Sequence, residues 1–203
     1  MKTVLWQGEQ IAPSKIVCVG RNYVEHIHEL NNEVPEEMVL FCKPNSAICN
    51  DLIAHRGEAI HYELELCLLF DGERFCAVGV GFDLTKRAQQ SRLKQQGLPW
   101  ERAKAFDGSA VFSEFVSVDA IDDTLMFALE VDGQARQRGN IELMISAPEK
   151  ILTEIQSFMT LQAGDIVMTG TPKGVGALVA GSRYLACLYQ HHTLLCELDL
   201  TAQ

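Results

Sequence analysis

The stretch that most constrains this chain is residues 61–70, which read His-Tyr-Glu-Leu-Glu-Leu-Cys-Leu-Leu-Phe. Polar and apolar residues alternate through Leu66, and the remainder is wholly apolar. Alternation with a period of two predicts a β-strand, here with His61, Glu63 and Glu65 on one face. The apolar end predicts a strand buried on both faces. The chain must therefore place this strand inside a sheet, with two acids leading into the core.

The two glutamates have two interpretations. Carboxylates two residues apart on a strand lie roughly 7 Å apart, so a central cation could contact both. Buried acids are costly unless something positive pairs with them, and a hard divalent cation such as Mg²⁺ or Mn²⁺ suits oxygen ligands. A Glu-x-Glu strand is nevertheless more often a solvated face. The stretch by itself leaves both interpretations open, and the solvated face is the commoner.

Length and composition limit the classes of protein. A chain of 203 residues predicts a single domain, 1–203, with a sizeable core. Its net charge of −10 argues against nucleic acid or an anionic membrane as a partner. No run approaches the roughly 18 apolar residues that span a bilayer, and the N-terminus lacks the apolar core of a signal peptide. Seven cysteines without a CxxC motif predict buried free thiols in a reducing compartment, so we expect a cytoplasmic protein.

A histidine and a glutamate follow the first apolar strand, residues 16–20. Tyr23, Ile27 and Leu30 have helical spacing, which places His26 and Glu29 on one helix face. A histidine oriented by a carboxylate is the usual form of a general base. A solvated face that carries the two residues by chance is the alternative, favoured without other support. His28 points elsewhere and is expected to have no special role.

The segment after the central strand predicts a hairpin. Asp71-Gly72 is a strong turn signal, and residues 74–81 return as the partner strand. Gly79 and Gly81 in that strand suggest a bulge or a close backbone approach. Asp83 then precedes a helix predicted over 85–96. It is either a third carboxylate ligand or the helix N-cap, and the cap is the commoner role.

The rest of the chain predicts further strands and one long helix. Residues 38–43 form a strand ended by Pro44, and Lys43-Pro44-Asn45 either faces a site or, as is commoner, forms a structural turn. Residues 98–109 are irregular and contain Lys104, which is exposed by default or else binds a carboxylate or enolate. The remaining elements are a hairpin over 125–138, a helix over 148–159 with an apolar stripe, a strand over 165–169 and a hairpin over 184–200.

A glycine-rich loop, residues 170–176, follows the strand over 165–169. Its backbone N–H groups suggest binding of a phosphate or a carboxylate. It is not a Walker loop, because its lysine precedes the second glycine, no Ser or Thr follows that lysine, and no helical pattern comes after.

These motifs together resemble the fumarylacetoacetate hydrolase family, from about residue 16 to about residue 188. Each motif is modest, and their order along the chain makes the resemblance specific. They are Gly20-Arg21-Asn22-Tyr23 with His26 and Glu29, residues 61–66, Asp83-Leu84-Thr85, Gly97-Leu98-Pro99-Trp100 with Lys104, and residues 169–176. The resemblance implies an α+β fold, a mixed and mostly β roll of several sheets with short helices, and a homodimer.

The resemblance also implies site residues. Glu63, Glu65 and Asp83 match carboxylates that hold Mg²⁺ or Mn²⁺. His26 and Glu29 match a pair that activates water, and Lys104 a lysine that faces the substrate's oxygens. The expected substrate contacts are Arg21, Gln90, Gly170 and Thr171.

The implied activity is metal-dependent cleavage of a C–C bond in an acylpyruvate, a small anionic keto acid, with release of pyruvate. Oxaloacetate decarboxylation or tautomerisation, and isomerisation of a 5-carboxymethyl-2-hydroxymuconate type of substrate, use the same metal-stabilised enolate and remain alternatives. A non-catalytic relative is a third possibility. The chain departs from the family at Ala88, where an acid is usual, and its segments over 50–59 and 70–81 are short. The shortened rim could change a lid or the substrate range.

Overall fold

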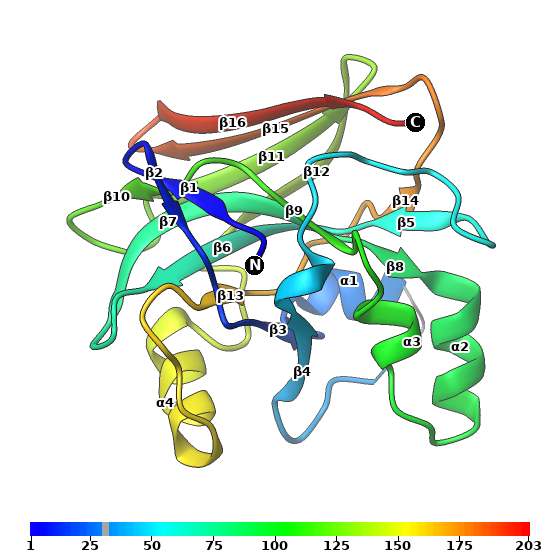
Figure 1. Ribbon diagram of the computed structural model, residues 1–203, viewed down its shortest axis with the longest axis horizontal. Coiled ribbons are helices and arrows are strands. Elements are labelled where there is room, and N and C mark those ends of the chain that lie inside the picture. The colour runs from blue at the N-terminus through cyan, green and yellow to red at the C-terminus, as the bar shows by residue number, and fades with distance from the viewer. Residues whose placement is uncertain (30–32) are drawn as a thin grey trace.

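The centre of the fold is a seven-stranded sheet, seen in the computed structural model of Figure 1, which describes residues 1–29 and 33–203. Its order is β10-β7-β6-β13-β3-β4, and β9 pairs with β7. The β13–β3 pair is parallel and the β6–β7 pair is antiparallel. The strands are β3 (Lys15–Gly20), β4 (Val39–Pro44), β6 (Leu64–Phe70), β7 (Phe75–Asp83), β9 (Ala110–Phe112), β10 (Val116–Ser117) and β13 (Ile166–Met168).

Three smaller sheets surround it. They are the pair β1 (Val4–Trp6) and β2 (Glu9–Ile11), a four-stranded sheet of β11 (Leu125–Val131), β12 (Gln134–Asn140), β15 (Arg183–Gln190) and β16 (Thr193–Thr201), and a three-stranded sheet of β5 (Ile60–Tyr62), β8 (Thr85–Lys86) and β14 (Gly176–Ala177).

The helices of the described residues are short. They are α1 (Val24–Glu29), the 3₁₀ turn Asn45–Ala47, α2 (Arg87–Gln95), α3 (Glu101–Lys104) and α4 (Pro148–Phe158). The expected α+β architecture, mostly strands in several sheets with short helices, is confirmed. None of these helices has the length and apolar character that crossing a membrane requires.

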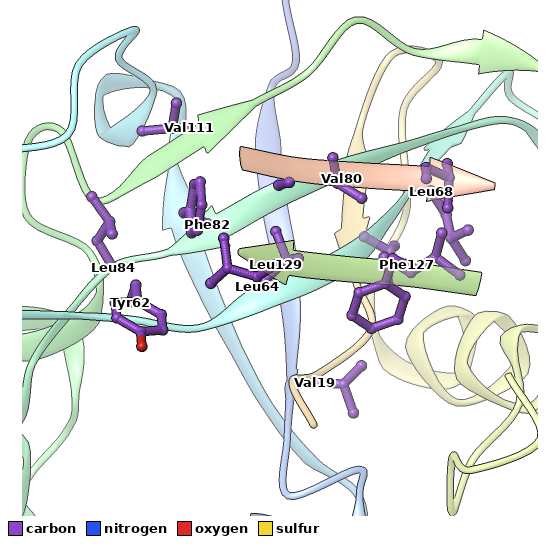
Figure 2. Close-up of a cluster of buried hydrophobic side chains, with 14 of the residues drawn as sticks. Val19, Tyr62, Leu64, Leu68, Val80, Phe82, Leu84, Val111, Phe127 and Leu129 are labelled. Carbon is purple, nitrogen blue, oxygen red and sulfur yellow. The ribbon is translucent and has the colours of Figure 1, made fainter. Parts of the chain in front are cut away.

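The main core lies between the central sheet and the four-stranded sheet. Figure 2 shows Phe127 and Leu129 of β11 beside Leu64 of β6 and Val80 of β7. The opposite face of the central sheet carries a second buried cluster, which includes Cys67. Every residue of β6 is buried, which explains why its sequence stops alternating. Full burial of such a side chain stabilises the fold by about 1.5–3 kcal/mol.

The hairpin after β6 forms as the sequence predicts. The Asp71 carboxylate accepts hydrogen bonds from the N–H groups of Glu73 and Arg74, both at 2.8 Å, and closes the turn. The close approach predicted at the glycines is confirmed at Gly81, where a Cβ atom would lie 2.7 Å from the Phe112 ring. The register shift between β6 and β7 lies at Leu69/Phe70 and not at the glycines.

Several predicted boundaries were wrong. The strand over 61–70 is broken at Glu63, so His61 belongs to β5 and pairs with Thr85 in a different sheet. The return strand runs on to Asp83, and α2 begins only at Arg87 because residues 85–86 form β8. The irregular stretch over 98–109 contains α3.

Other expectations need smaller corrections. No sequence pattern predicted β1, β2, β9, β10 or β14. The apolar stripe of α4 is buried at Ile151 and Ile155, but Phe158 is 60% exposed. Leu30, and residues 31–32 of the loop predicted over 31–37, lie outside the described residues. All seven cysteines are free, as predicted, but only Cys18, Cys67 and Cys187 are buried and the other four are partly exposed.

A buried aspartate, Asp165, connects the start of β13 to the start of β3 through hydrogen bonds and an ion pair. Asp165 has no exposed surface, and its carboxylate accepts hydrogen bonds from the Ser14 hydroxyl at 2.7 Å, the Gln162 N–H at 2.8 Å and the Lys15 ammonium at 2.5 Å. Burial would raise the pKa of this carboxyl, but Lys15 and the other donors outweigh it and hold the pKa below its ordinary value of 3.8.

We expect Asp165→Asn to lower the free energy of unfolding by about 2–3 kcal/mol at neutral pH, because charge-assisted bonds to a buried group are lost. A lowered folded-state pKa means that the unfolded chain binds the proton more tightly. The stabilisation is therefore complete above pH 3.8 and lost as the pH falls below it. Urea unfolding of both proteins at pH 7 and near pH 3 measures this, and a difference that persists at low pH would contradict it.

Candidate active site

Three carboxylates converge where β6 and β7 lie side by side. Glu63 occupies the break between β5 and β6, Glu65 lies on β6, and Asp83 ends β7. The Asp83 N–H donates to the Glu63 carbonyl at 2.9 Å, which brings the two residues together. Carboxylate oxygens of the three lie within 4.8 Å of one another, and the residues are only 6%, 2% and 1% exposed. Asp83 is therefore a member of this cluster and not the cap of α2.

Cationic side chains surround the acids. The Lys104 ammonium donates to Glu63 at 2.8 Å, to Asp83 at 2.7 Å and to the Thr85 hydroxyl at 2.6 Å. The Arg87 guanidinium forms an ion pair with Glu63 and donates to the Gln90 side chain at 2.7 Å. Lys104 is 3% exposed, so it is buried and not the exposed lysine that is usual in such a stretch.

Charge is distributed unequally over the acids. Burial would raise the pKa of Glu63, but Lys104 and Arg87 outweigh it and hold that pKa well below its usual range. Burial, Asp83 and Glu63 together raise the pKa of Glu65 well above its ordinary value of 4.5. Glu65 is therefore a buried acid for which the neighbouring cations do not provide enough positive charge.

This donor set fits a hard divalent cation. Such a cation prefers carboxylate oxygens and would supply the charge that Glu65 lacks. Glu63, Glu65 and Asp83 are the residues that would hold it, and Lys104 and Arg87 would then face any anion bound beside it.

The predicted histidine and glutamate pair is formed. His26 on α1 is buried and lines the cavity beside the acids, and its Nδ1 lies 3.1 Å from Glu29 Oε2. The other Glu29 oxygen accepts a hydrogen bond from the Gly174 N–H at 3.0 Å. Glu29 therefore orients the imidazole and is itself held by the glycine-rich loop.

The glycine-rich loop binds carboxylates that belong to the chain. Besides the Gly174 contact with Glu29, the Gly170 N–H donates to Glu65 at 2.7 Å. Gly170 has a φ of +99°, and a Cβ there would lie 2.8 Å from that of Asn22. The Thr171 hydroxyl donates to the Leu64 carbonyl at 2.8 Å. The loop therefore holds the acidic cluster and the His26 pair in one arrangement.

All the predicted site residues except Glu29 and Gly170 line one cavity of about 40 Å³. Glu29 and Gly170 lie behind it and contact lining residues. His61, which the alternation had placed with the glutamates, is not part of the lining. Phe41 and Trp100, whose ring centroids are 6.0 Å apart, form one wall.

Three cations near the acids were not predicted as site residues, namely Arg87 and Lys94, which line the cavity, and Lys43. Arg87 lies three residues before Gln90 on α2, a helical spacing that could have indicated a shared face. For Lys43 a structural turn was the commoner of two expected roles, yet its side chain is fully buried with Nζ 2.9 Å from Asp83. Nothing in its local sequence signals a partner forty residues away.

Comparisons with known proteins point to one family. Residues 15–74 and 76–200 match the family model for the fumarylacetoacetate (FAA) hydrolase C-terminal domain. Oxaloacetate tautomerase YcgM of Escherichia coli is 39% identical over 212 residues, which cover 93% of this chain and 95% of that protein.

Two solved structures are also similar. A protein from Oleispira antarctica, described as a fumarylacetoacetate isomerase/hydrolase, is 33% identical with a TM-score of 0.95 and full coverage of both chains. Fumarylpyruvate hydrolase from Pseudomonas aeruginosa, in complex with Mn²⁺ and pyruvate, is 29% identical with a TM-score of 0.87, covering 98% of this chain and 94% of the other. The chain described here belongs to the fumarylacetoacetate hydrolase family.

Proposed function

We propose that this protein interconverts the enol and keto forms of oxaloacetate with the help of a divalent cation, Mg²⁺ or Mn²⁺. The observation that carries the proposal is the cluster of three buried acids beside His26, Lys104 and Arg87 in one small cavity. The similarity to a protein named oxaloacetate tautomerase, which extends over almost the whole chain, supports it.

The reaction moves one proton from the hydroxyl on C2 of the enol to C3. Because Nδ1 of His26 is directed at Glu29, Nε2 is the nitrogen available to the substrate. Nε2 accepts the hydroxyl proton, and the imidazolium then returns that proton to C3 of the enolate. Glu29 favours this exchange because its negative charge stabilises the imidazolium.

Negative charge develops on the enolate oxygen between these two transfers. The Lys104 ammonium and the Arg87 guanidinium lie in the cavity, and their positive charge stabilises the enolate oxygen. Glu63, Glu65 and Asp83 would hold a divalent cation, which would supply Lewis-acid stabilisation of the same charge. Lys104 and Arg87 also balance the two carboxylates of oxaloacetate.

Cleavage of a C–C bond in an acylpyruvate is the second candidate. The His26–Glu29 pair is equally suited to take a proton from water, and the similar Pseudomonas aeruginosa structure is that of a fumarylpyruvate hydrolase. Cleavage needs an attacking water beside the substrate, whereas tautomerisation does not. The similarity to oxaloacetate tautomerase YcgM over 93% of this chain favours tautomerisation.

The test compares both reactions on one preparation. The ultraviolet absorbance of enol-oxaloacetate is followed with Mg²⁺ or Mn²⁺ and with EDTA, and pyruvate release is measured from acetylpyruvate and from oxaloacetate. Faster enol decay that EDTA removes, without pyruvate release, is the expected result. Metal-dependent pyruvate release from acetylpyruvate together with an uncatalysed rate of enol decay would favour the hydrolase instead.

A further inference from the structure

Lys43 is a buried cation that the reaction described above does not use. It lies on β4, its side chain has no exposed surface, and it does not line the reaction cavity. Its ammonium lies 2.9 Å from Asp83 Oδ1, donates a short hydrogen bond to the Lys104 carbonyl, and reaches the Leu84 carbonyl at 3.5 Å. One side chain thus connects the end of β7 with the end of α3.

Lys43 and Lys104 contact opposite oxygens of the same carboxylate. Lys43 faces Oδ1 of Asp83 as an ion pair without hydrogen-bond geometry, while Oδ2 accepts a hydrogen bond from Lys104, which also contacts Glu63. The ammonium of Lys43 therefore limits rotation of the Asp83 carboxylate and leaves Oδ2 directed at the acidic cluster. Its bond to the Lys104 carbonyl fixes the backbone from which the Lys104 side chain starts.

Fold stability alone does not explain a lysine here. Burying a charged pair costs as much solvation as it regains in attraction, and apolar residues of similar volume often replace such pairs without loss. Methionine has nearly the length of lysine and would fill the space on β4. A cation at position 43 is an advantage over an apolar residue only if the orientation of Asp83 and Lys104 is important for function.

We propose that Lys43 is a positioning residue of the candidate metal centre, which sets its affinity for a divalent cation by orienting Asp83. The proposal rests on the metal-binding part of the proposed function and not on the choice of reaction. It requires no contact between Lys43 and the substrate or the cation.

The test measures Mn²⁺ binding by the electron paramagnetic resonance signal of free Mn²⁺, on wild type, Lys43→Met and Lys15→Met. Lys15 is the matched control, because it lies on the neighbouring strand β3 and pairs with the buried Asp165, remote from the acidic cluster. Loss of an outer-shell partner weakens metal affinity by about 10–100-fold, which is the rise in Kd expected for Lys43→Met. Lys15→Met should lower the melting temperature and leave the Kd for Mn²⁺ unchanged.

A second variant, Lys43→Gln, covers the case in which Lys43→Met does not fold. Lys43→Gln removes the charge but keeps an N–H donor for the Lys104 carbonyl and Asp83, so it is expected to fold and to bind Mn²⁺ with an intermediate affinity. A folded Lys43→Met or Lys43→Gln protein with wild-type Mn²⁺ affinity would overturn the proposal. So would an equal loss of affinity in Lys15→Met, since affinity would then follow stability and not position.

The outcomes separate this inference from the proposed reaction. Wild type that tautomerises oxaloacetate with Mn²⁺, beside Lys43 variants of unchanged affinity, would overturn the role of Lys43 alone. Mn²⁺ binding that depends on Lys43, beside a wild type without tautomerase activity, would overturn the reaction alone. A wild type that binds no Mn²⁺ would overturn both.

Discussion

Replacing Glu65 by glutamine is expected to abolish divalent-metal binding while the metal-free protein remains folded. Burial and the neighbouring Asp83 and Glu63 raise the pKa of Glu65 well above 4.5, so the metal-free protein favours the neutral form of this side chain. Glutamine is neutral and has nearly the same shape. Its carbonyl oxygen can accept the hydrogen bond from Gly170 that the carboxylate now accepts at 2.7 Å. Only the ability to become an anionic ligand is lost.

The effect on function should be large. Loss of an outer-shell partner already weakens metal binding by about 10–100-fold, and loss of a ligand should exceed that. Catalysis should fall by about 1000-fold, since a bound cation supplies several kcal/mol and each 1.4 kcal/mol is about a factor of ten. Mn²⁺ titration and the enol-decay assay measure the two effects. Glu130→Gln, on the exposed side of β11, is the matched control, and wild-type Mn²⁺ affinity in Glu65→Gln would contradict the assignment of Glu65 as a ligand.

The thermal stability of Glu65→Gln provides a second test. A raised folded-state pKa means that the folded, metal-free protein binds the Glu65 proton more tightly than the unfolded chain. Its stability therefore decreases as the pH rises above 4.5, the ordinary value of this carboxyl. Glu65→Gln lacks this loss, so in EDTA at neutral pH it should melt at a higher temperature than wild type. Thermal unfolding at pH 5 and pH 7 tests the sign, and a lower melting temperature of the variant at pH 7 would contradict it.

The strands could be predicted from sequence wherever one pattern dominated. The apolar run of β6 and the Asp71-Gly72 turn predicted the central hairpin, because burial and turn chemistry are local properties. The pattern failed at Glu63, since alternation continues from β5 into β6 although the chain changes sheets there. A break of this kind is decided by which strands pair, and pairing with β8 and β14 is a long-range property.

The site residues also divide into those that a local motif identifies and those that depend on long-range contacts. Glu63, Glu65 and His26 stand in motifs that the family resemblance identifies. Lys43 had no such signal, because its meaning depends on Asp83 and on the Lys104 carbonyl, which only the fold brings to it. The glycine-rich loop was predicted to bind an anion, but whether that anion belonged to a substrate or to the chain could not be read from spacing.

Replacing His26 by alanine is expected to lower kcat for enol–keto conversion by about 100- to 10,000-fold, the usual contribution of a general base. Its imidazole lines the cavity, and Glu29 holds it through Nδ1 at 3.1 Å. Mn²⁺ affinity should be unchanged, because the proposed ligands are the three carboxylates. His28→Ala is the matched control, since His28 is exposed on the same helix and should have wild-type kcat.

Glu29→Gln separates orientation from proton transfer. Its amide oxygen can still accept the Nδ1–H hydrogen bond, but its NH₂ group cannot accept the hydrogen bond that the Gly174 N–H now donates to the second carboxylate oxygen. The charge that stabilises the imidazolium is also gone, and kcat should fall by less than in His26→Ala because the imidazole remains. Each variant is measured for enol decay and for pyruvate release from acetylpyruvate. Equal losses of kcat in His26→Ala and Glu29→Gln would mean that the negative charge of Glu29, and not the imidazole of His26, limits the reaction. If His26→Ala loses acetylpyruvate cleavage and keeps tautomerisation, the imidazole activates water for hydrolysis and the proton shuttle proposed for it is wrong.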